Sequence, residues 1–97
     1  MSDLSYDRLS DDEVAKRLES LAGWTVDDGM LAREFVFDSY GRGVMFATAC
    51  GHLADDLNHH PDLFIGYQKV RVALVTHDAG GLTAYDFEMA RRIQAIT

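Results

Sequence analysis

The segment from Trp24 to Phe37, WTVDDGMLAREFVF, decides how the chain folds. Its centre, Asp27-Asp28-Gly29, is typical of a tight turn, because aspartate and glycine tolerate the positive φ angles that hairpin turns require. Beyond the turn, alternate residues of an extended chain point to the same side, so Leu31, Phe35 and Phe37 fall on one face, which Arg33 shares. We therefore predict a β-hairpin in which Leu31, Phe35 and Phe37 share one face of the second strand.

A helix is predicted on each side of this hairpin. Residues 10–13, Ser-Asp-Asp-Glu, form a capping box, and the apolar residues that follow recur at helical spacing until Gly23. After the hairpin, Asp38 or Ser39 can cap a second helix with an apolar stripe. We expect Pro61 to end that helix, because the residue before a proline is pushed out of the α region.

The rest of the chain repeats the pattern. Residues 63–67 and 69–77 are strand-like, residues 78–81 form a loop, and Thr83 can cap a last helix. Hairpin-like pairs that alternate with helices predict an α+β fold, an antiparallel sheet with helices on one face. We expect one domain over residues 1–97.

The composition argues against several classes of protein: membrane-spanning, secreted and nucleic-acid-binding. The hydrophobic fraction of 47% and the charged fraction of 26% are ordinary for a soluble protein, and no apolar run is long enough to cross a membrane. The first residues lack the pattern of a secretory signal, and Cys50 has no partner for an intramolecular disulfide. We therefore expect a cytoplasmic protein. The net charge of -7 argues against nucleic acid as a partner.

Three of the four histidines carry the functional signal: His59, His60 and His77. The ordinary pKa of histidine, about 6.5, lets it exchange protons near neutral pH. Asp55 and Asp56 stand four residues before His59 and His60, so on a helix each carboxylate could orient one imidazole. His77, at the expected end of a strand, comes from a different element. We predict that the three imidazoles converge on one ligand.

Each of these residues also has a plain structural interpretation. A single histidine can mark the polar end of a helix or strand, Tyr67 can be a half-buried strand aromatic, and Asp86 can be a capping residue. His52 lies outside the spacing of the other three, and we expect it to be a structural or surface residue.

A metal site is the main chemical alternative, because Asp55 and the three clustered histidines offer ligands that zinc or iron accept. Against it, adjacent histidines on a helix point about 100° apart, and the chain has no HExxH motif and no second cysteine. Cys50 falls on an apolar stripe and is a weak candidate for a nucleophile. We expect no metal.

The spacing of these candidates resembles the signature of the pterin-4a-carbinolamine dehydratases: Asp55-x3-His59-His60-Pro61-x5-Tyr67-x9-His77-x8-Asp86. The resemblance extends from Gly23-Trp24 to the entry of the last helix, and so covers most of the chain. This sequence departs from the family pattern at Tyr85, where a basic residue is common, and at Asp55, where glutamate is usual.

The resemblance implies a four-stranded antiparallel sheet with three helices on one face, in the order α-β-β-α-β-β-α, and assembly as a homodimer or homotetramer. The implied reaction is loss of water from 4a-hydroxytetrahydropterin to give quinonoid dihydropterin, which recycles the tetrahydrobiopterin cofactor of aromatic amino acid hydroxylases. The reaction requires neither a metal nor an organic cofactor. Because some dehydratases of this fold also act as dimerisation cofactors of other proteins, a non-catalytic interaction module is the alternative.

The resemblance also implies roles for individual residues. The functional histidines are His59, His60 and His77, and the substrate-binding or orienting residues are Asp55, Tyr67 and Asp86. Our hypothesis is that His59 and His77 are the acid/base pair, that His60 positions the pterin and that Asp55 orients His59.

Overall fold

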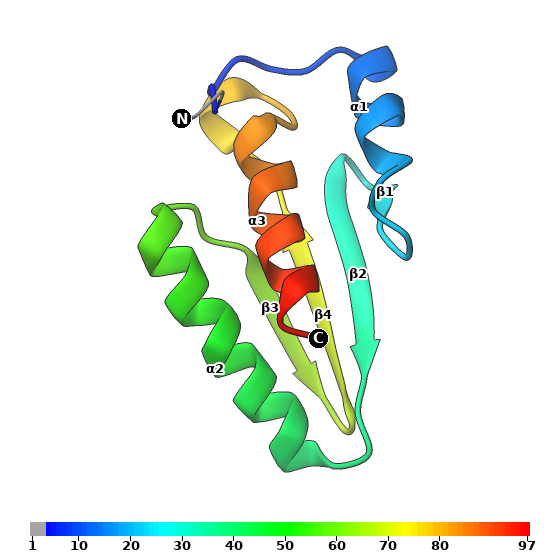
Figure 1. Ribbon diagram of the computed structural model, residues 1–97, viewed down its shortest axis with the longest axis vertical. Helices are drawn as coiled ribbons and strands as arrows, with labels where there is room; N and C mark the ends of the chain where they lie inside the picture. The colour runs from blue at the N-terminus through cyan, green and yellow to red at the C-terminus, as the bar shows by residue number, and fades with distance from the viewer. Residues whose placement is uncertain (1–3) are drawn as a thin grey trace.

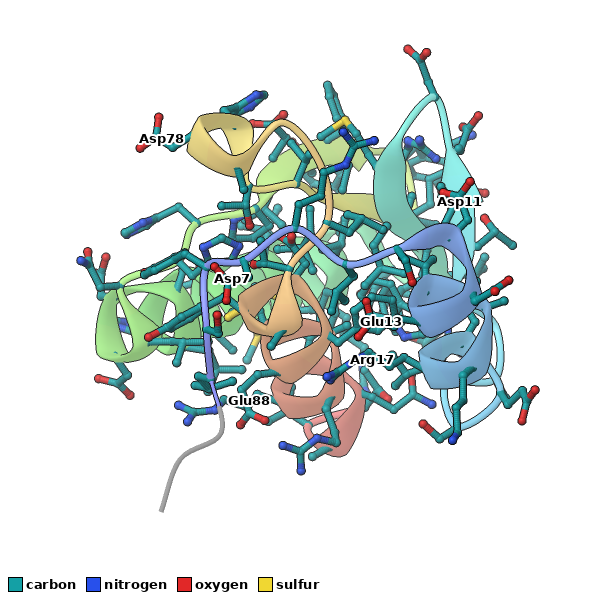
Figure 2. The ribbon with its side chains drawn as sticks, turned by 90° about the horizontal axis from the view of Figure 1, so that it is seen from above. Asp7, Asp11, Glu13, Arg17, Asp78 and Glu88 are labelled. Atoms are coloured by element: carbon teal, nitrogen blue, oxygen red, sulfur yellow. The ribbon has the colours of Figure 1, made fainter. Side chains whose placement is uncertain are left out.

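The computed structural model describes residues 4–97 and consists of one antiparallel sheet with helices on one face (Figures 1 and 2). In chain order the elements are α1 (Asp11–Leu18), β1 (Thr25–Asp27), β2 (Met30–Val36), α2 (Tyr40–Leu57), β3 (Asp62–Gly66), β4 (Lys69–Leu74), the 3-10 helix η1 (His77–Ala79) and α3 (Ala84–Ala95). The four strands lie in the order β1-β2-β4-β3, which places β4 inside the sheet between β2 and β3. The predicted α+β architecture and its element order are confirmed.

The hairpin between β1 and β2 forms around the predicted turn. Asp28 and Gly29 adopt positive φ angles of 52° and 77°, which fit a tight two-residue connection. The turn sets the register, in which Val26 pairs with Leu31, and β2 then pairs with β4 so that Leu31 lies opposite Leu74. One face of the sheet therefore carries a continuous row of apolar side chains.

The hydrophobic core lies between that face and helices α2 and α3. Its largest fully buried apolar side chains come from β2, β4, α2 and α3, and they are Leu31, Val70, Val72, Leu74, Cys50, Met89 and Ile93. Helix α1 adds Val14 and Leu18 at the margin of this cluster. Among residues 4–97, no helix is long and apolar enough to cross a membrane.

The first helix begins at the predicted capping box. The Ser10 hydroxyl accepts the Glu13 backbone N–H at 3.2 Å, and the Glu13 carboxylate accepts the Ser10 backbone N–H at 2.9 Å. Hydrogen bonds from the Ser10 backbone and side chain to the Glu13 carboxylate hold the pKa of Glu13 below its ordinary value. The stabilisation that the Glu13 carboxylate gives to the helix is therefore fully present above its unfolded-state pKa. It is lost as the pH falls through the lower pKa of the folded state.

Helix α2 ends earlier than we predicted. Its last residue is Leu57, and Asn58 follows in the left-handed conformation with φ 54° and ψ 44°. Asparagine tolerates this conformation better than most residues, and it is a common helix end. The backbone N–H of His59 then donates to the Ala54 carbonyl at 3.1 Å, which closes the last turn. Asn58, not Pro61, ends the helix, and so His59 and His60 are not helical.

The strands of the second hairpin, β3 and β4, also end at other residues than predicted. Strand β3 ends at Gly66, one residue before the predicted end, and β4 ends at Leu74, so His77 does not end a strand. The chain after β4 folds into a short loop instead, because the backbone N–H of Thr76 donates to the Gly81 carbonyl at 3.2 Å. His77 is the first residue of the 3-10 helix η1, which lies within this loop between Thr76 and Gly81.

The capping box of α1 gives a stability prediction. Ser10→Ala should lower the free energy of unfolding by about 1 kcal/mol, because it leaves the Glu13 N–H without its side-chain acceptor. For a domain of this size the melting temperature should fall by roughly 4 to 8 °C. Calorimetry or thermal circular dichroism measures the change. Ser20→Ala is the matched control: Ser20 is exposed beyond the helix, its hydroxyl donates only to the exposed Arg17 carbonyl at 3.0 Å, and its loss should cost less than about 0.5 kcal/mol. Equal effects of the two substitutions would contradict the prediction.

Candidate active site

The three clustered histidines lie around one cavity. His59 and His60 follow α2, and His77 begins η1, yet all three line a cavity of about 590 Å³. The pairing of β3 with β4 explains why, because Asp62 lies opposite Ala73 and the start of one strand therefore meets the end of the other. The sequence-based prediction that these histidines share one site is consistent with this geometry.

His59 is fixed by a buried carboxylate. Its Nε2 lies 2.6 Å from Oδ1 of Asp86, which is 0% exposed, and His59 itself is only 8% exposed. An ionised carboxylate can only accept hydrogen bonds, so the imidazole donates through Nε2–H. The other ring nitrogen, Nδ1, is then the one that remains for proton exchange with a ligand.

The Asp86 carboxylate accepts hydrogen bonds from three separate parts of the chain. In addition to His59, its carboxylate accepts the Thr76 hydroxyl at 2.8 Å and the Thr83 backbone N–H at 2.9 Å. The last bond belongs to the capping box of α3, which confirms the predicted cap at Thr83. The positive end of the helix dipole favours a carboxylate at this position. Asp86 is therefore both a capping residue and the anchor of His59.

His60 is paired with a different carboxylate from the one we expected. Its Nε2 lies 3.0 Å from Oδ1 of Asp55, whereas the hypothesis assigned Asp55 to His59 and Asp56 to His60. The expected pairs required a continuous helix, and the left-handed Asn58 removes that geometry. The side chains of His60 and Asp55 are 57% and 76% exposed, so this ion pair contributes little to stability.

His77 differs from both of its neighbours. Its side chain is exposed and makes no hydrogen bond or ion pair within residues 4–97, so both ring nitrogens are open to a ligand. His52 lies exposed on α2 and does not line the cavity, in agreement with the expectation of a surface residue.

Tyr67 does not lie with the histidines. Because Gly66 pairs with Lys69, residues 67 and 68 form the turn between β3 and β4, at the opposite end of the hairpin from His77 (Figure 1). The Tyr67 side chain is 75% exposed there. The expectation of a half-buried strand residue is wrong, and within this chain Tyr67 is too far along the sheet to contact a ligand held by the histidines.

A tyrosine that the sequence did not single out lines the cavity instead. Tyr6 stacks on Tyr85, with ring centroids 4.0 Å apart and an angle of 9° between the planes, and its centroid lies 6.4 Å from that of His59. Partial burial, together with the neighbouring Tyr85 hydroxyl, raises the pKa of Tyr6. Tyr6 precedes the first helix and belongs to no periodic pattern or motif, so nothing in the sequence pointed to it.

The cavity offers imidazoles and not a thiol. Cys50 is buried in the core, and burial raises the pKa of its thiol to about 11, which keeps it protonated at neutral pH. Within residues 4–97, no group of three or more His, Cys, Asp or Glu side chains is arranged to hold a metal ion. These side chains can perform proton transfer, through His59 and His60, which carboxylates orient, and through His77, whose ring has no such partner among residues 4–97.

Known proteins share this fold and sequence over nearly the whole chain. Residues 7–96 match the family model described as pterin 4 alpha carbinolamine dehydratase. A relative from Natronomonas pharaonis is 46% identical over 90 residues, which cover 93% of this chain and 96% of the relative. A relative from Sulfurisphaera tokodaii is 37% identical, with 92% and 96% covered. Both carry a provisional name as pterin-4-alpha-carbinolamine dehydratases.

Two solved structures extend the comparison. The crystal structure of a transcriptional coactivator/pterin dehydratase from Brucella melitensis superposes with a TM-score of 0.88 at 35% identity, covering 93% of this chain and 98% of that one. A pterin dehydratase-like protein described as a RuBisCO assembly factor of the alpha-carboxysome gives a TM-score of 0.60 at 25% identity, with 74% and 83% covered. The family match and these relatives together show that the chain belongs to the pterin-4-alpha-carbinolamine dehydratase family.

Proposed function

We propose that this protein catalyses the dehydration of 4a-hydroxytetrahydropterin to quinonoid dihydropterin by histidine acid/base catalysis. The observation that carries the proposal is the cavity of about 590 Å³ that His59, His60 and His77 line together. Membership of the dehydratase family supports the same reaction. Recycling of tetrahydropterins, action as a homo-oligomer and a cytoplasmic location remain predictions.

The reaction needs two proton transfers on one flat substrate. A proton must reach the hydroxyl on C4a so that the C–O bond breaks and water leaves, and the proton on N5 must be removed. The electrons of the N5–H bond then form the C4a=N5 double bond of the product. One acid and one base suffice, and each well-placed group typically contributes about 10² to 10⁴ in rate.

The geometry suggests how the histidines divide these tasks. His59 is held through Nε2 by Asp86, so Nδ1 is its reactive nitrogen. His77 lies in the segment after β4, and both of its ring nitrogens are open. We assign these two as the acid/base pair. His60, which is exposed and paired with Asp55, would position the pterin ring. Asp86, in place of Asp55, is then the residue that orients His59.

A role in protein assembly is the alternative. The Brucella melitensis protein is described as both a transcriptional coactivator and a pterin dehydratase, and the carboxysome protein as an assembly factor. A chain with only an interaction role would not need three imidazoles around one cavity. Loss of those imidazoles without loss of any measurable turnover would favour the assembly role.

The first test removes the unpaired imidazole. His77→Ala should lower kcat for freshly generated 4a-hydroxytetrahydropterin by about a hundredfold or more, because one of the two proton transfers loses its catalyst. A spectrophotometric assay of quinonoid dihydropterin formation measures the rate. The matched control is His52→Ala, which removes an exposed imidazole outside the cavity and should leave kcat unchanged. Unchanged turnover in His77→Ala would sink the assignment.

The second test concerns Asp86 as a positioning residue. In Asp86→Asn the amide can donate to Nε2 of His59, which would move the ring proton to Nδ1 and withdraw the base. We expect kcat to fall at least about tenfold with a smaller change in KM. Nitrogen-15 NMR of the His59 ring should report the change of tautomer, which loss of stability alone would not produce. Asp55→Asn is the control, and it should leave the His59 spectrum as it is.

The third test asks whether the reaction uses a metal. Dehydration by imidazoles alone should continue at the same rate after dialysis against EDTA, and added zinc should not raise it. Activity that chelation abolishes and zinc restores would replace the proposed mechanism with a metal-dependent one.

A further inference from the structure

Two stacked tyrosine rings lie beside the imidazole of His59. Tyr6 belongs to the segment before α1 and Tyr85 to the first turn of α3, and their ring centroids are 4.0 Å apart. The centroid of the His59 ring lies 6.4 Å from that of Tyr6 and 5.8 Å from that of Tyr85, with angles of 50° and 42° between the planes. Aromatic rings attract one another at such distances and tilts. His59 therefore packs against both rings at once.

The hydrogen bond to Asp86 does not by itself fix the plane of the His59 ring. It holds one atom, Nε2, at 2.6 Å from Oδ1 of Asp86. The torsion about the Cβ–Cγ bond of histidine has only a broad intrinsic preference, so the ring can turn while this hydrogen bond bends but persists. Turning the ring moves Nδ1, the nitrogen that remains for proton exchange. A second contact must therefore hold the plane of the ring.

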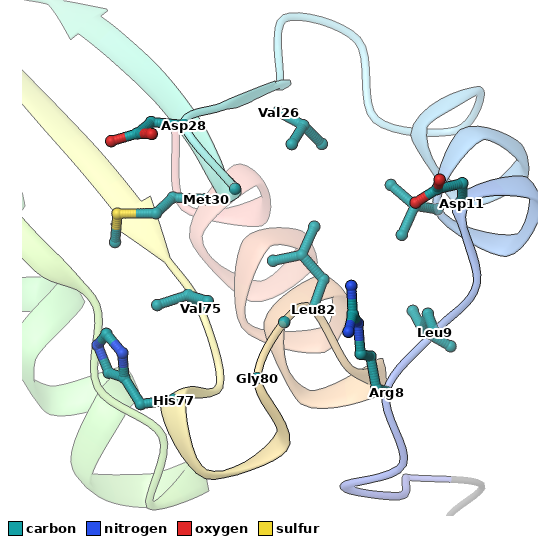
Figure 3. A pocket seen from close by; sticks show the side chains of 13 residues that line it. Arg8, Leu9, Asp11, Val26, Asp28, Met30, Val75, His77, Gly80 and Leu82 are labelled. Carbon is teal, nitrogen blue, oxygen red and sulfur yellow. The ribbon is translucent and has the colours of Figure 1, made fainter.

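The segment that carries Tyr6 is fastened to the loop before α3. The N–H of Leu9 donates to the Leu82 carbonyl at 2.8 Å, and the Leu9 side chain packs against the hydrophobic core. Arg8 lies against Gly81, where an added Cβ would come within 2.8 Å of the Arg8 Nε. Figure 3 shows Arg8 and Leu9 beside this loop, where they line a second cavity of about 490 Å³. Figure 2 shows the segment crossing above the start of α3.

We propose that Tyr6 and Tyr85 are positioning residues, whose stacked rings hold the plane of the His59 imidazole while Asp86 holds its Nε2. The inference rests on the proposed function for the identity of the reaction. Together the two contacts aim Nδ1 at the substrate, and neither tyrosine takes part in the proton transfers. Tyr85 stands where the family pattern commonly has a basic residue, so this contact is specific to chains with an aromatic residue there.

Nuclear magnetic resonance of the free protein tests the proposal without turnover. Carbon-13 relaxation of the C–H bonds of the His59 ring reports how much the ring moves. In Tyr6→Ala we expect this motion to increase. The nitrogen-15 shifts should still place the ring proton on Nε2, because Asp86 remains. An imidazole that is as rigid in Tyr6→Ala as in the wild type would overturn the proposal.

Two variants control for the loss of a tyrosine. Tyr6→Phe keeps the stacked ring and should keep the imidazole as rigid as in the wild type. Tyr40→Ala removes a tyrosine that is 55% exposed, against 51% for Tyr6, and should leave the His59 signals unchanged. Tyr40 begins α2, at the opposite end of the molecule from η1 (Figure 1). A mobile imidazole in Tyr40→Ala would mean that general loss of stability loosens the ring, and would contradict the proposal.

Turnover measures the consequence for catalysis. Tyr6→Ala should lower kcat about threefold to tenfold, which corresponds to the energy of one aromatic pair, and should change KM by less than about twofold. Tyr6→Phe should keep the kcat of the wild type. A higher KM with unchanged kcat would mean that Tyr6 contacts the substrate and does not position His59.

Tyr85→Ala tests whether the two rings act as one unit. The substitution keeps the backbone N–H of residue 85, which donates to the Thr83 hydroxyl at 3.3 Å, so this part of the α3 cap remains. We expect kcat to fall as in Tyr6→Ala. The double variant should be no more than about twofold slower than either single variant, because each ring holds the other in place. Losses that multiply would show two separate contacts and overturn the role of the stack.

The two kinds of measurement separate this inference from the proposed function. Absence of turnover by the wild-type protein would overturn the dehydratase function, and the relaxation measurement would still decide whether the tyrosines hold the His59 ring. Turnover by the wild type with the same kcat in Tyr6→Ala would overturn only the positioning role.

Discussion

The buried carboxylate of Asp86 is the interaction on which the rest of the site depends. An ionised group that is 0% exposed is stable only if its oxygens are well supplied with donors, and here His59, Thr76 and Thr83 supply them. Those donors come from the connection after α2, the segment between β4 and η1, and the start of α3. One side chain thus ties together the three segments that surround the histidine cavity, and it holds them at hydrogen-bond distance.

Much of the fold could be predicted, because local patterns agreed with the tertiary structure. The Asp28-Gly29 turn and the caps at Ser10 and Thr83 depend on side chains within a few residues of each other, and all of them form as expected. The end of α2 was predicted wrongly, because Asn58 adopts a left-handed conformation that proline rules do not anticipate. That single residue changes the partners of both His59 and His60.

In the candidate site, too, features set by nearby residues could be predicted and contacts between distant residues could not. The grouping of the three histidines followed from their spacing and from resemblance to a family, but their carboxylate partners did not. The hydrogen bond between His59 and Asp86 joins residues that are 27 positions apart. It depends on the tertiary structure, including the pairing of β3 with β4, and not on any local pattern. Tyr67 fitted the spacing yet lies in an exposed turn, and Tyr6 fitted no spacing yet lines the cavity.

The short segment before α1 contributes Tyr6 to the histidine cavity, and Arg8 and Leu9 to a neighbouring cavity of about 490 Å³. Its visible backbone attachment to the loop before α3 is the hydrogen bond from Leu9 to Leu82. The two cavities therefore share a support that is separate from the sheet. A partner protein fused upstream of this segment would therefore disturb the lining of both cavities, although every histidine stays in place.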